Sequence, residues 1–337
     1  MLSTSWFFSR KIGIDLGTAN TLIYVKGRGI VLKEPSVVAV RKDTGQVLDV
    51  GTRAQKMIGR VPENITIIRP MRDGVVSNFD ITKKMLREFI SRVYPGRFPF
   101  PLQAVVSVSL DVTEIEKKAV LEAVRQAGAR AVYLVENSIA GAVGINLPIE
   151  ENEAIMLVDI GGGTSEAAVI TLGGIVSKNC VRLGGEQFNS AIRHYIRKKY
   201  NFLVGERTAE EVKIKIGSAL HTPGKQQLEV RGTDLMRRMP GKLILDSWEI
   251  TDVLSELVAS IIQAIKKTLE ATPVELINDI IANGIIMTGG GALLKDLHRA
   301  ITKETKIAVS LAENPLDSVA IGTGKMLSSL EMLKKLA

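Results

Sequence analysis

Two short segments of this chain repeat one pattern, and this repeat constrains the fold more than any other feature. Residues 12–20 read Ile-Gly-Ile-Asp-Leu-Gly-Thr-Ala-Asn, and residues 157–165 read Leu-Val-Asp-Ile-Gly-Gly-Gly-Thr-Ser. In each, apolar residues flank an aspartate, Asp15 or Asp159, and a glycine turn follows, which is typical of a buried strand that ends in a tight bend. The amides of such a turn can bind phosphate. Two copies, with aspartates 144 positions apart (159 minus 15), predict two related halves that share one polyphosphate and its metal.

The length and composition allow two domains of ordinary size. The chain has 337 residues, of which 45% are hydrophobic and 24% charged, as expected for a globular protein with substantial cores. A single cysteine, Cys180, excludes an internal disulfide and indicates a reducing cytosol. Residues 1–11 lack the apolar core of a secretory signal, and no run of about 18 apolar residues could span a bilayer. We therefore expect a cytoplasmic protein whose membrane contact is peripheral.

The net charge of +8 is compatible with either nucleic acid or anionic lipid as a partner. The basic pairs are scattered along the chain and lack the interleaved aromatic residues that stack on bases. They are Lys83-Lys84, Lys117-Lys118, Arg237-Arg238, Lys266-Lys267 and Lys334-Lys335. We interpret most of them as solvated helix faces and expect no nucleic-acid partner.

The first half of the chain is predicted to begin with antiparallel strands and to continue with alternating helices and strands. The clearest helix covers 113–127, because Thr113 and Glu116 form a capping box and Gly128 follows its end. The predicted strands are 12–15, 22–26, 37–40, 104–108 and 133–135, and a short helix covers 139–143.

The same pattern restarts after residue 153, which is the repeat seen at the scale of a domain. Strands are predicted around Asp159, at 167–171 and at 175–180, followed by helices at 187–199 and 248–269. A polar region, 217–242, is predicted as an insertion with small strands of its own. After a strand at 285–287 comes the turn 288–291, and a helix is predicted to follow directly from Ala292, with its N-terminus toward an anion or a polar ligand edge.

A single glycine-rich turn is weak evidence for a ligand-binding site, because most such turns are tight turns without a ligand. Here there are three, and two of them follow an aspartate. The chain has neither the Gly-x-x-x-x-Gly-Lys-Ser/Thr loop nor the Gly-x-Gly-x-x-Gly motif, so the common P-loop and dinucleotide-binding folds are not supported.

The arrangement instead resembles the actin superfamily, and within it the MreB/Mbl family of bacterial actins. The resemblance is specific and covers essentially the whole chain. It rests on these segments: Ile12–Leu22 (IGIDLGTANTL), Glu34–Ala39 (EPSVVA), Ile68–Val75 (IRPMRDGV), Val158–Thr164 (VDIGGGT), Val204–Glu210 (VGERTAE), Met287–Leu294 (MTGGGALL), Asn314–Asp317 (NPLD) and Ala320–Gly324 (AIGTG).

This resemblance implies an α/β actin-like (ribonuclease H-like) fold: two duplicated α/β domains around a nucleotide cleft, each with a small subdomain. The implied segments are 1–38 (domain IA), 39–71 (subdomain IB), 72–151 (IA continued), 152–187 (domain IIA), 188–248 (subdomain IIB), 249–312 (IIA continued) and 313–337 (return to IA).

The resemblance also implies a site for ATP or ADP with Mg²⁺. In the family, both phosphate turns contact the nucleotide and the two aspartates, here Asp15 and Asp159, organise the metal through water. Residues 210–213 would meet the ribose and adenine, with Glu210 and Lys213 as polar contacts, and the turn at 288–291 would close the other side of the base. The implied nucleotide-binding residues are Thr18, Ala19, Asn20, Gly162, Gly163, Thr164, Glu210, Glu211, Val212, Lys213, Thr288, Gly289, Gly290 and Gly291; Asp159 and Thr164 would also serve catalysis.

The chain departs from the family where the attacking water is positioned. Family members usually have two glutamates before a proline, whereas this chain has Glu136-Asn137-Ser138. Positioning dominates phosphoryl-transfer catalysis, and an error of about 1 Å can cost on the order of a hundredfold. We therefore expect ATP binding with slow hydrolysis; the alternative is that Glu136 compensates for Asn137. Glu186 and Asn189 also replace aspartates that are typical of the family.

Aromatic residues are concentrated in two segments, Trp6-Phe7-Phe8 and Phe98 with Phe100. Together these hold five of the ten Phe and Trp residues, and Arg10, Lys11 and Arg97 lie beside them. This combination favours peripheral attachment to anionic lipid, as in the family. The alternative is that Phe98 and Phe100 pack under a neighbouring helix.

The function implied by the resemblance is that of a cytoskeletal ATP-binding protein. It would polymerise with itself on the inner face of an anionic membrane and act with bitopic membrane proteins of the wall-elongation machinery. Two alternatives stay open. One is a hydrolysis-impaired paralogue that co-assembles with an active relative. The other is a small-molecule kinase of the same superfamily, which Asn137 disfavours because such chemistry needs a carboxylate.

Overall fold

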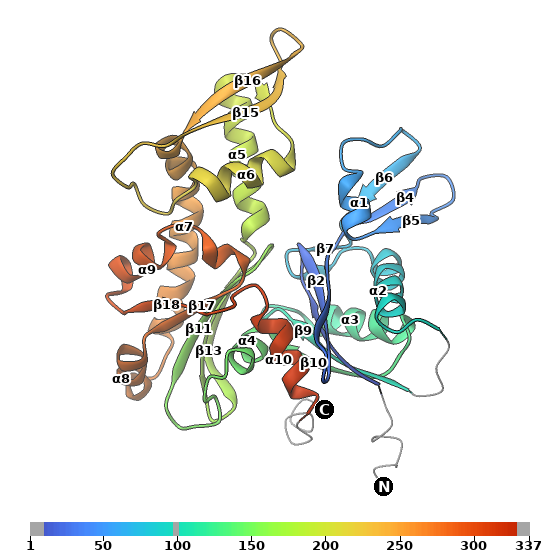
Figure 1. Ribbon diagram of the computed structural model, residues 1–337. Coiled ribbons are helices and arrows are strands. Elements are labelled where there is room, and N and C mark those ends of the chain that lie inside the picture. Colours follow the sequence, from blue (N-terminus) through green and yellow to red (C-terminus); the bar gives the residue numbers. More distant parts are fainter. Residues whose placement is uncertain (1–9, 97–100, 329–337) are drawn as a thin grey trace. The chain divides into compact units, whose positions relative to one another are not determined.

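The computed structural model describes residues 10–96 and 101–328, and the chain forms two compact units (Figure 1). Unit 1 comprises residues 1–153, 170–176 and 312–337. Unit 2 comprises residues 154–169 and 177–311. The predicted membrane residues Trp6, Phe7, Phe8, Phe98 and Phe100 lie outside the described residues.

A five-stranded sheet in the order β10-β9-β1-β2-β3 forms the centre of unit 1. β1 runs parallel to β9 and antiparallel to β2, and β10 runs parallel to β9. Every residue of β9 is buried, as expected for a strand whose sheet is covered on both faces. The strands are β1 (Arg10–Leu16), β2 (Asn20–Val25), β3 (Gly29–Pro35), β9 (Leu102–Val108) and β10 (Ala129–Glu136).

Helices cover both faces of this sheet. Figure 1 shows α4 and α10 on one side and α2 and α3 on the other. The N-terminus of α3 has the predicted capping box between Thr113 and Glu116. α4 and α10 approach closely: a Cβ added to Gly144 would lie 1.8 Å from the carbonyl oxygen of Ser318. The helices are α2 (Phe79–Val93), α3 (Glu114–Gln126), α4 (Asn137–Gly144) and α10 (Ser318–Met326).

Unit 1 also contains a small three-stranded sheet in the order β5-β4-β6, with one short helix. Glu34, near the end of β3, accepts hydrogen bonds from the amide and hydroxyl of Thr52, both at 2.6 Å, and thereby fixes the start of that helix. The elements are β4 (Val38–Arg41), β5 (Val47–Val50), α1 (Thr52–Lys56) and β6 (Ile65–Ile68); the hairpin of β7 (Met71–Arg72) and β8 (Val75–Val76) follows.

Unit 2 repeats the central sheet of unit 1. Its order, β13-β12-β11-β17-β18, matches β3-β2-β1-β9-β10 strand for strand. β11 runs parallel to β17, as β1 does to β9. The duplication predicted from the two turns is therefore present in the topology. The strands are β11 (Ile155–Ile160), β12 (Ser165–Thr171), β13 (Gly174–Val181), β17 (Ile285–Thr288) and β18 (Val309–Leu311).

The longest helix of unit 2, α7, has its apolar residues on one side. Ile250, Leu254, Ile261 and Ile265 are at most 1% exposed and belong to the core of this unit. A capping box between Asp246 and Glu249 fixes its start. The helices are α5 (Gly185–Tyr200), α6 (Glu206–Ile216), α7 (Ser247–Glu270), α8 (Val274–Asn283) and α9 (Leu297–Thr305), with one 3-10 helix, η2 (Gly290–Leu293). The insertion predicted at 217–242 contains β15 (Gln227–Asp234) and the start of β16 (Met239–Asp246), and these two strands pair beside β14 (Phe202–Leu203).

One strand was not predicted, and one predicted helix was misplaced. The strand predicted at 37–40 is present as β4 of the small sheet, whereas β3, the third strand of the opening sheet, was not predicted. The helix predicted directly from Ala292 is only the 3-10 turn η2, and α9 begins at Leu297 after Asp296, which has φ of 60°. A left-handed residue interrupts a right-handed helix, so the N-terminus of α9 does not directly follow the glycine turn.

Candidate functional site

The turn between β1 and β2 is closed by its own backbone. The amide of Gly17 donates to the carbonyl of Asn20 at 3.0 Å. Ser36 then engages the turn twice, with its hydroxyl donating to the carbonyl of Gly17 at 2.7 Å and its amide to that of Ala19 at 2.9 Å. The amides of Thr18 and Ala19 donate no hydrogen bond within the described part of the chain. In this turn the carbonyls of Gly17, Ala19 and Asn20 are therefore engaged, and two amide donors remain for a ligand.

The turn between β11 and β12 has the same design. The amide of Gly161 donates to the carbonyl of Thr164 at 2.8 Å. The start of α5 engages two more carbonyls: the amide of Gly185 donates to the carbonyl of Gly161 at 3.0 Å, and the amide of Glu186 donates to that of Gly162 at 2.8 Å. Among the described residues, the amides of Gly162 and Gly163 have no acceptor. Each unit therefore has two adjacent amides that donate no hydrogen bond among the described residues, and such amides can bind an anion.

The two predicted metal aspartates have different environments. Asp15 is partly exposed and accepts a hydrogen bond from the Ser107 hydroxyl at 3.3 Å. Asp159 is 7% exposed, and burial, with a further contribution from the Glu166 carboxylate, raises its pKa to about 7. Glu166 is itself 1% exposed on β12. Burial therefore disfavours the charged form of Asp159.

Lys213 places an ammonium group beside the second turn. Its Nζ donates to the carbonyl of Gly185 at 3.1 Å, and Gly185 is the residue whose amide bonds to Gly161. Burial lowers the pKa of Lys213, while Glu210 and Glu186 act in the opposite direction. A cation at this position can attract the phosphate that the turn amides would bind.

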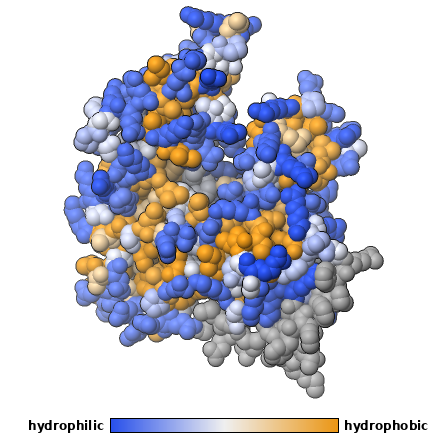
Figure 2. Space-filling model, in the orientation of Figure 1, coloured by the Kyte–Doolittle hydropathy of each residue, from blue (hydrophilic) through white to orange (hydrophobic). Residues whose placement is uncertain are grey.

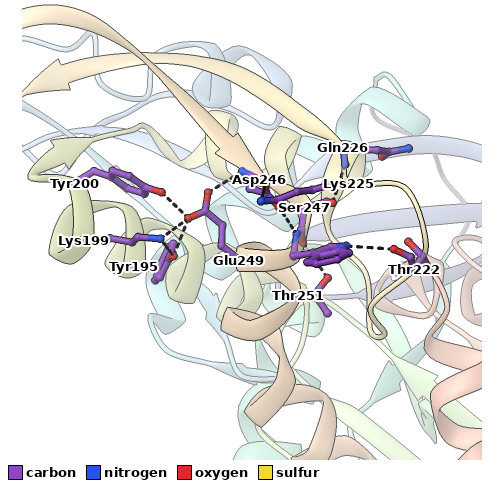
Figure 3. A network of polar contacts seen from close by, with 11 residues as sticks. Tyr195, Lys199, Tyr200, Thr222, Lys225, Gln226, Asp246, Ser247, Glu249 and Thr251 are labelled. Atoms are coloured by element: carbon purple, nitrogen blue, oxygen red, sulfur yellow. Dashed lines mark hydrogen bonds and ion pairs between the residues drawn. The ribbon is translucent and has the colours of Figure 1, made fainter.

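The C-terminal half of α5 is fixed by a polar network (Figure 3). Glu249, at the start of α7, accepts hydrogen bonds from Tyr195 at 2.8 Å, Tyr200 at 2.6 Å and Lys199 at 2.9 Å. Burial alone would raise the pKa of Glu249, but these hydrogen bonds lower it overall. Because α5 packs on the second turn at its other end, this network helps to hold that turn in place.

The turn after β17 approaches the buried aspartate. Thr288 pairs with Asp159 and is fully buried. Gly289 has φ of 84°, and a Cβ there would lie 2.3 Å from Oδ1 of Asp159 and 2.4 Å from the carbonyl oxygen of Ile160. Only glycine fits this position. Gly290 is exposed and Gly291 is buried against Ile160.

The predicted base-contact stretch lies on α6. Lys213 faces the second turn, as described above, and Glu210 is exposed. Glu211 forms an ion pair with Lys215, and Val212 is fully buried in the core of unit 2. A ligand at this helix could therefore meet the Val212 backbone but not its side chain.

Glu136 and Asn137 lie where β10 meets α4. Glu136 is the N-cap residue and Asn137 the first residue of the helix, and both are partly exposed. The next residue, Ser138, is fully buried, and its hydroxyl has no hydrogen-bond partner among the described residues. At the other end of α4, Lys325 donates to the carbonyls of Val143 at 3.2 Å and Gly144 at 2.7 Å, which anchors the helix.

The residues of each unit are compatible with a magnesium nucleotide. In residues 10–96 and 101–328, no group of three or more His, Cys, Asp or Glu side chains could hold a metal by itself. Each unit instead presents one carboxylate and two unengaged amides, and unit 2 adds a lysine, which suits an ion that keeps its water and is held largely by phosphate. Sequence reasoning did not assign Ser36, Gly185 or Glu166 to the site. Ser36 lies in the Glu34–Ala39 segment, whose resemblance to the family could have pointed to it. Gly185 and Glu166 are recognised only from their contacts in the structure.

The duplicated sheets, each with a phosphate-type turn after its central strand, define the actin-like fold. The comparison with solved structures agrees with this fold assignment. The crystal structure of MreB 5 of Spiroplasma citri bound to AMPPNP matches with a TM-score of 0.90 and 32% identity, covering 97% of each chain. A MamK double helical filament, 20% identical with a TM-score of 0.80, shares the fold.

Sequence comparison identifies the family. The model for the MreB/Mbl protein family matches residues 9–335. The cell shape-determining protein Mbl of Bacillus subtilis is 45% identical over 329 residues, covering 97% of this chain and 98% of that protein. The cell shape-determining protein MreB of Escherichia coli is 48% identical over 330 residues, covering 96% and 95%. The chain belongs to the MreB/Mbl family.

Proposed function

We propose that this protein binds ATP with Mg²⁺. The observation that carries the proposal is that each of the two turns has three engaged carbonyls and two amides, at Thr18 and Ala19 and at Gly162 and Gly163, that donate no hydrogen bond among the described residues. The turns of both units would contribute phosphate contacts, Lys213 would add positive charge, and Asp15 and Asp159 would orient the water around the metal. The bound metal would neutralise phosphate charge. The nucleotide in the MreB 5 structure supports this assignment.

We further propose that hydrolysis is slow. Asn137 lies at the start of α4, at the position where family members have the glutamate that orients the attacking water. An amide can orient water but cannot accept its proton as a carboxylate can, and the side chain is shorter by one methylene. This same substitution supports the alternative of a hydrolysis-impaired paralogue that co-assembles with an active relative.

The polymer that we propose is a head-to-tail filament of this chain, in which nucleotide binding favours assembly. Membership of the MreB/Mbl family supports it. Large apolar side chains are also exposed on both units, including Ile115, which is 80% exposed, and Val274, which is 73% exposed. Figure 2 shows such apolar side chains among hydrophilic ones on one face. A heterologous contact that does not close produces an open filament.

Attachment to the inner face of an anionic membrane completes the proposal. Among the described residues, no helix has the length and apolar character needed to cross a bilayer. Arg10 and Pro101, which flank the two aromatic segments of the sequence, are joined by a hydrogen bond of 3.1 Å from the Arg10 amide to the Pro101 carbonyl. Filaments attached there would act with bitopic membrane proteins of the wall-elongation machinery to set cell shape, the role named for the curated relatives.

One experiment tests these proposals together. Sedimentation is measured with ATP, ADP or no nucleotide, each with and without anionic vesicles, and phosphate release is followed in parallel. We expect ATP-dependent pelleting and slow phosphate release that Asn137→Glu accelerates. Absence of pelleting in every condition would refute the filament, and equal release from parent and variant would refute the role of Asn137.

A further inference from the structure

Helix α5 contains the only run of three consecutive Lys or Arg residues in the sequence, Arg197-Lys198-Lys199. Lys199 belongs to the polar network around Glu249, whose carboxylate lies 2.9 Å from its Nζ (Figure 3). Arg197 and Lys198 are exposed, as is Arg193 one turn earlier, and none of these three forms an ion pair within the described part of the chain. One basic residue of the run is therefore used within unit 2, whereas three cations of α5 remain exposed.

This exposed group differs from the other basic pairs of the sequence. In four of those pairs one member forms an ion pair with a nearby carboxylate: Lys83 with Asp80, Lys117 with Glu114, Arg237 with Asp234, and Lys266 with Glu304. Arg193 and Arg197 are instead like charges at i,i+4 spacing, which destabilises a helix. The helix dipole favours cations in the last turn of α5, but Arg193 lies about two turns before its end. A basic surface without local counterions suits an anionic partner.

The same chain presents an acidic surface in the loop between α4 and β11. Residues 150–153 read Glu-Glu-Asn-Glu, and no other stretch of four residues in the sequence has three acidic residues. Glu151 and Glu153 are exposed and form no ion pair with any described residue. The backbone holds the loop in place, because the carbonyl of Glu151 accepts hydrogen bonds from the amide of Leu172 at 2.9 Å and from the Thr171 hydroxyl at 3.2 Å. The loop is thus a fixed anionic surface.

The charges on the two surfaces have similar spacing. Arg193 and Arg197 are about one helical turn apart, which is about 6 Å along the axis at a rise of about 1.5 Å per residue. Glu151 and Glu153 are two residues apart, which allows at most about 7 Å between their Cα atoms. Each arginine can therefore meet one carboxylate, and the planar guanidinium suits such a pair better than an ammonium does.

We propose that α5 of one copy of this protein docks through Arg193, Arg197 and Lys198 on the 150–153 loop of a second copy. This inference rests on the filament proposed above and names two surfaces that join its subunits. A contact between two different surfaces is heterologous, so it produces an open polymer unless it closes.

A second copy is favoured over a lipid surface as the partner of α5. None of the exposed large apolar side chains of the described chain lies on this helix, and a basic helix that binds a membrane inserts apolar side chains as well. The contact would also be linked to the nucleotide. The first residue of α5, Gly185, donates to the carbonyl of Gly161 in the second phosphate-type turn, so a docked subunit and a bound nucleotide would contact the same helix.

The test is charge reversal of the full chain, followed by sedimentation with ATP. The α5 variant is Arg193→Glu/Arg197→Glu, the loop variant is Glu151→Lys/Glu153→Lys, and a combined variant carries all of these changes. The matched control is Lys267→Glu/Lys303→Glu, which makes the same change in net charge as the α5 variant on exposed residues of α7 and α9.

We expect the α5 variant and the loop variant each to raise the critical concentration for pelleting at least about tenfold, because like charges that face each other across an interface oppose binding strongly. The control should change it little. The combined variant should pellet as the parent does, and so should an equimolar mixture of the α5 and loop variants, because each reversed surface then meets its opposite charge.

The outcomes separate this inference from the filament itself. If the parent does not pellet, the filament is refuted and the inference with it. If the parent pellets and the α5 variant pellets equally well, the filament stands but the docking surface is wrong. If both variants fail and neither the mixture nor the combined variant recovers, the two surfaces do not pair and the proposal is overturned. Recovery in the combined variant excludes misfolding as the cause of the losses. Loss of binding to double-stranded DNA in the α5 variant, with unchanged pelleting, would identify a nucleic-acid surface and overturn the proposal.

Discussion

The two phosphate-type turns share one backbone design but differ in what surrounds their aspartates. In both, the third residue counted from the aspartate donates to the carbonyl three positions later, Gly17 to Asn20 and Gly161 to Thr164. Yet Asp15 is partly exposed beside a serine hydroxyl, whereas Asp159 is buried next to Glu166 and Gly289. The two units thus share the backbone of the turn, while their carboxylates differ in burial: Asp15 is partly exposed, and burial of Asp159 disfavours its charged form.

The largest expected effect is on stability and concerns the close approach of Gly289 to Asp159 in unit 2. Unit 1 has no glycine at the corresponding position. Counting from the pairs Ile14–Val106 and Asp159–Thr288, the corresponding residue of unit 1 is Val108. Gly289→Ala should destabilise the protein by about 3 kcal/mol, because φ is positive and the new Cβ would collide with Asp159. Gly205→Ala is the control, since a Cβ there meets nothing within 4 Å. Urea unfolding measures both; a loss below about 1 kcal/mol would show that the close approach can relax.

Removing each aspartate's charge tests the difference between the turns directly. The raised pKa of Asp159 means that the folded protein holds this proton more tightly, so stability falls as pH rises from about 4 through about 7. Asp159→Asn should therefore stabilise the nucleotide-free protein at pH 8 by on the order of 1–2 kcal/mol, and this gain should vanish below about pH 4. Asp15→Asn should give no comparable gain. Melting temperatures across this pH range measure both, and equal gains would remove the distinction between the two carboxylates.

The lysine beside the second turn offers a smaller effect on binding. Lys213→Met should weaken ATP binding about tenfold, or about 1.4 kcal/mol, because an ammonium next to the phosphate turn is lost. Lys215→Met is the matched control, since Lys215 lies on the same helix and pairs with Glu211 at the surface. Affinity is measured by titration calorimetry. Equal affinities for the two variants would place the nucleotide away from Lys213.

The smallest effect distinguishes the turn hydroxyls. Thr18 accepts a hydrogen bond from the Gly74 amide at 2.9 Å, whereas Thr164 reaches Glu166 only at 3.4 Å. Thr18→Val should cost about 1 kcal/mol of unfolding free energy, because the Gly74 amide loses its acceptor, and Thr164→Val should cost about half as much. Denaturant unfolding without nucleotide measures both losses and tests whether Thr18→Val costs more than Thr164→Val. The reverse order would mean that the second turn depends more on its side chain.

Local patterns predicted much of this fold. Short-range signals, the capping box at Thr113 and the apolar spacing of α7, correctly identified helices because those interactions act within a few residues. The strand after Pro35 was predicted correctly and is β4, but β3 at Gly29–Pro35 was missed, and a local pattern does not reveal which partner a strand pairs with. The helix after the third glycine turn was also misplaced, since apolar spacing cannot reveal the left-handed Asp296.

By itself, the sequence determined the duplication, the family and the positions of the phosphate-type turns, because the glycines and aspartates of each turn are close together in the chain and can be recognised there. The tertiary structure alone decided which groups surround those turns. Ser36 and Gly185 engage carbonyls of the turns, and Glu166 lies beside Asp159. These neighbours are separated along the chain, and burial and charge depend on distance in space.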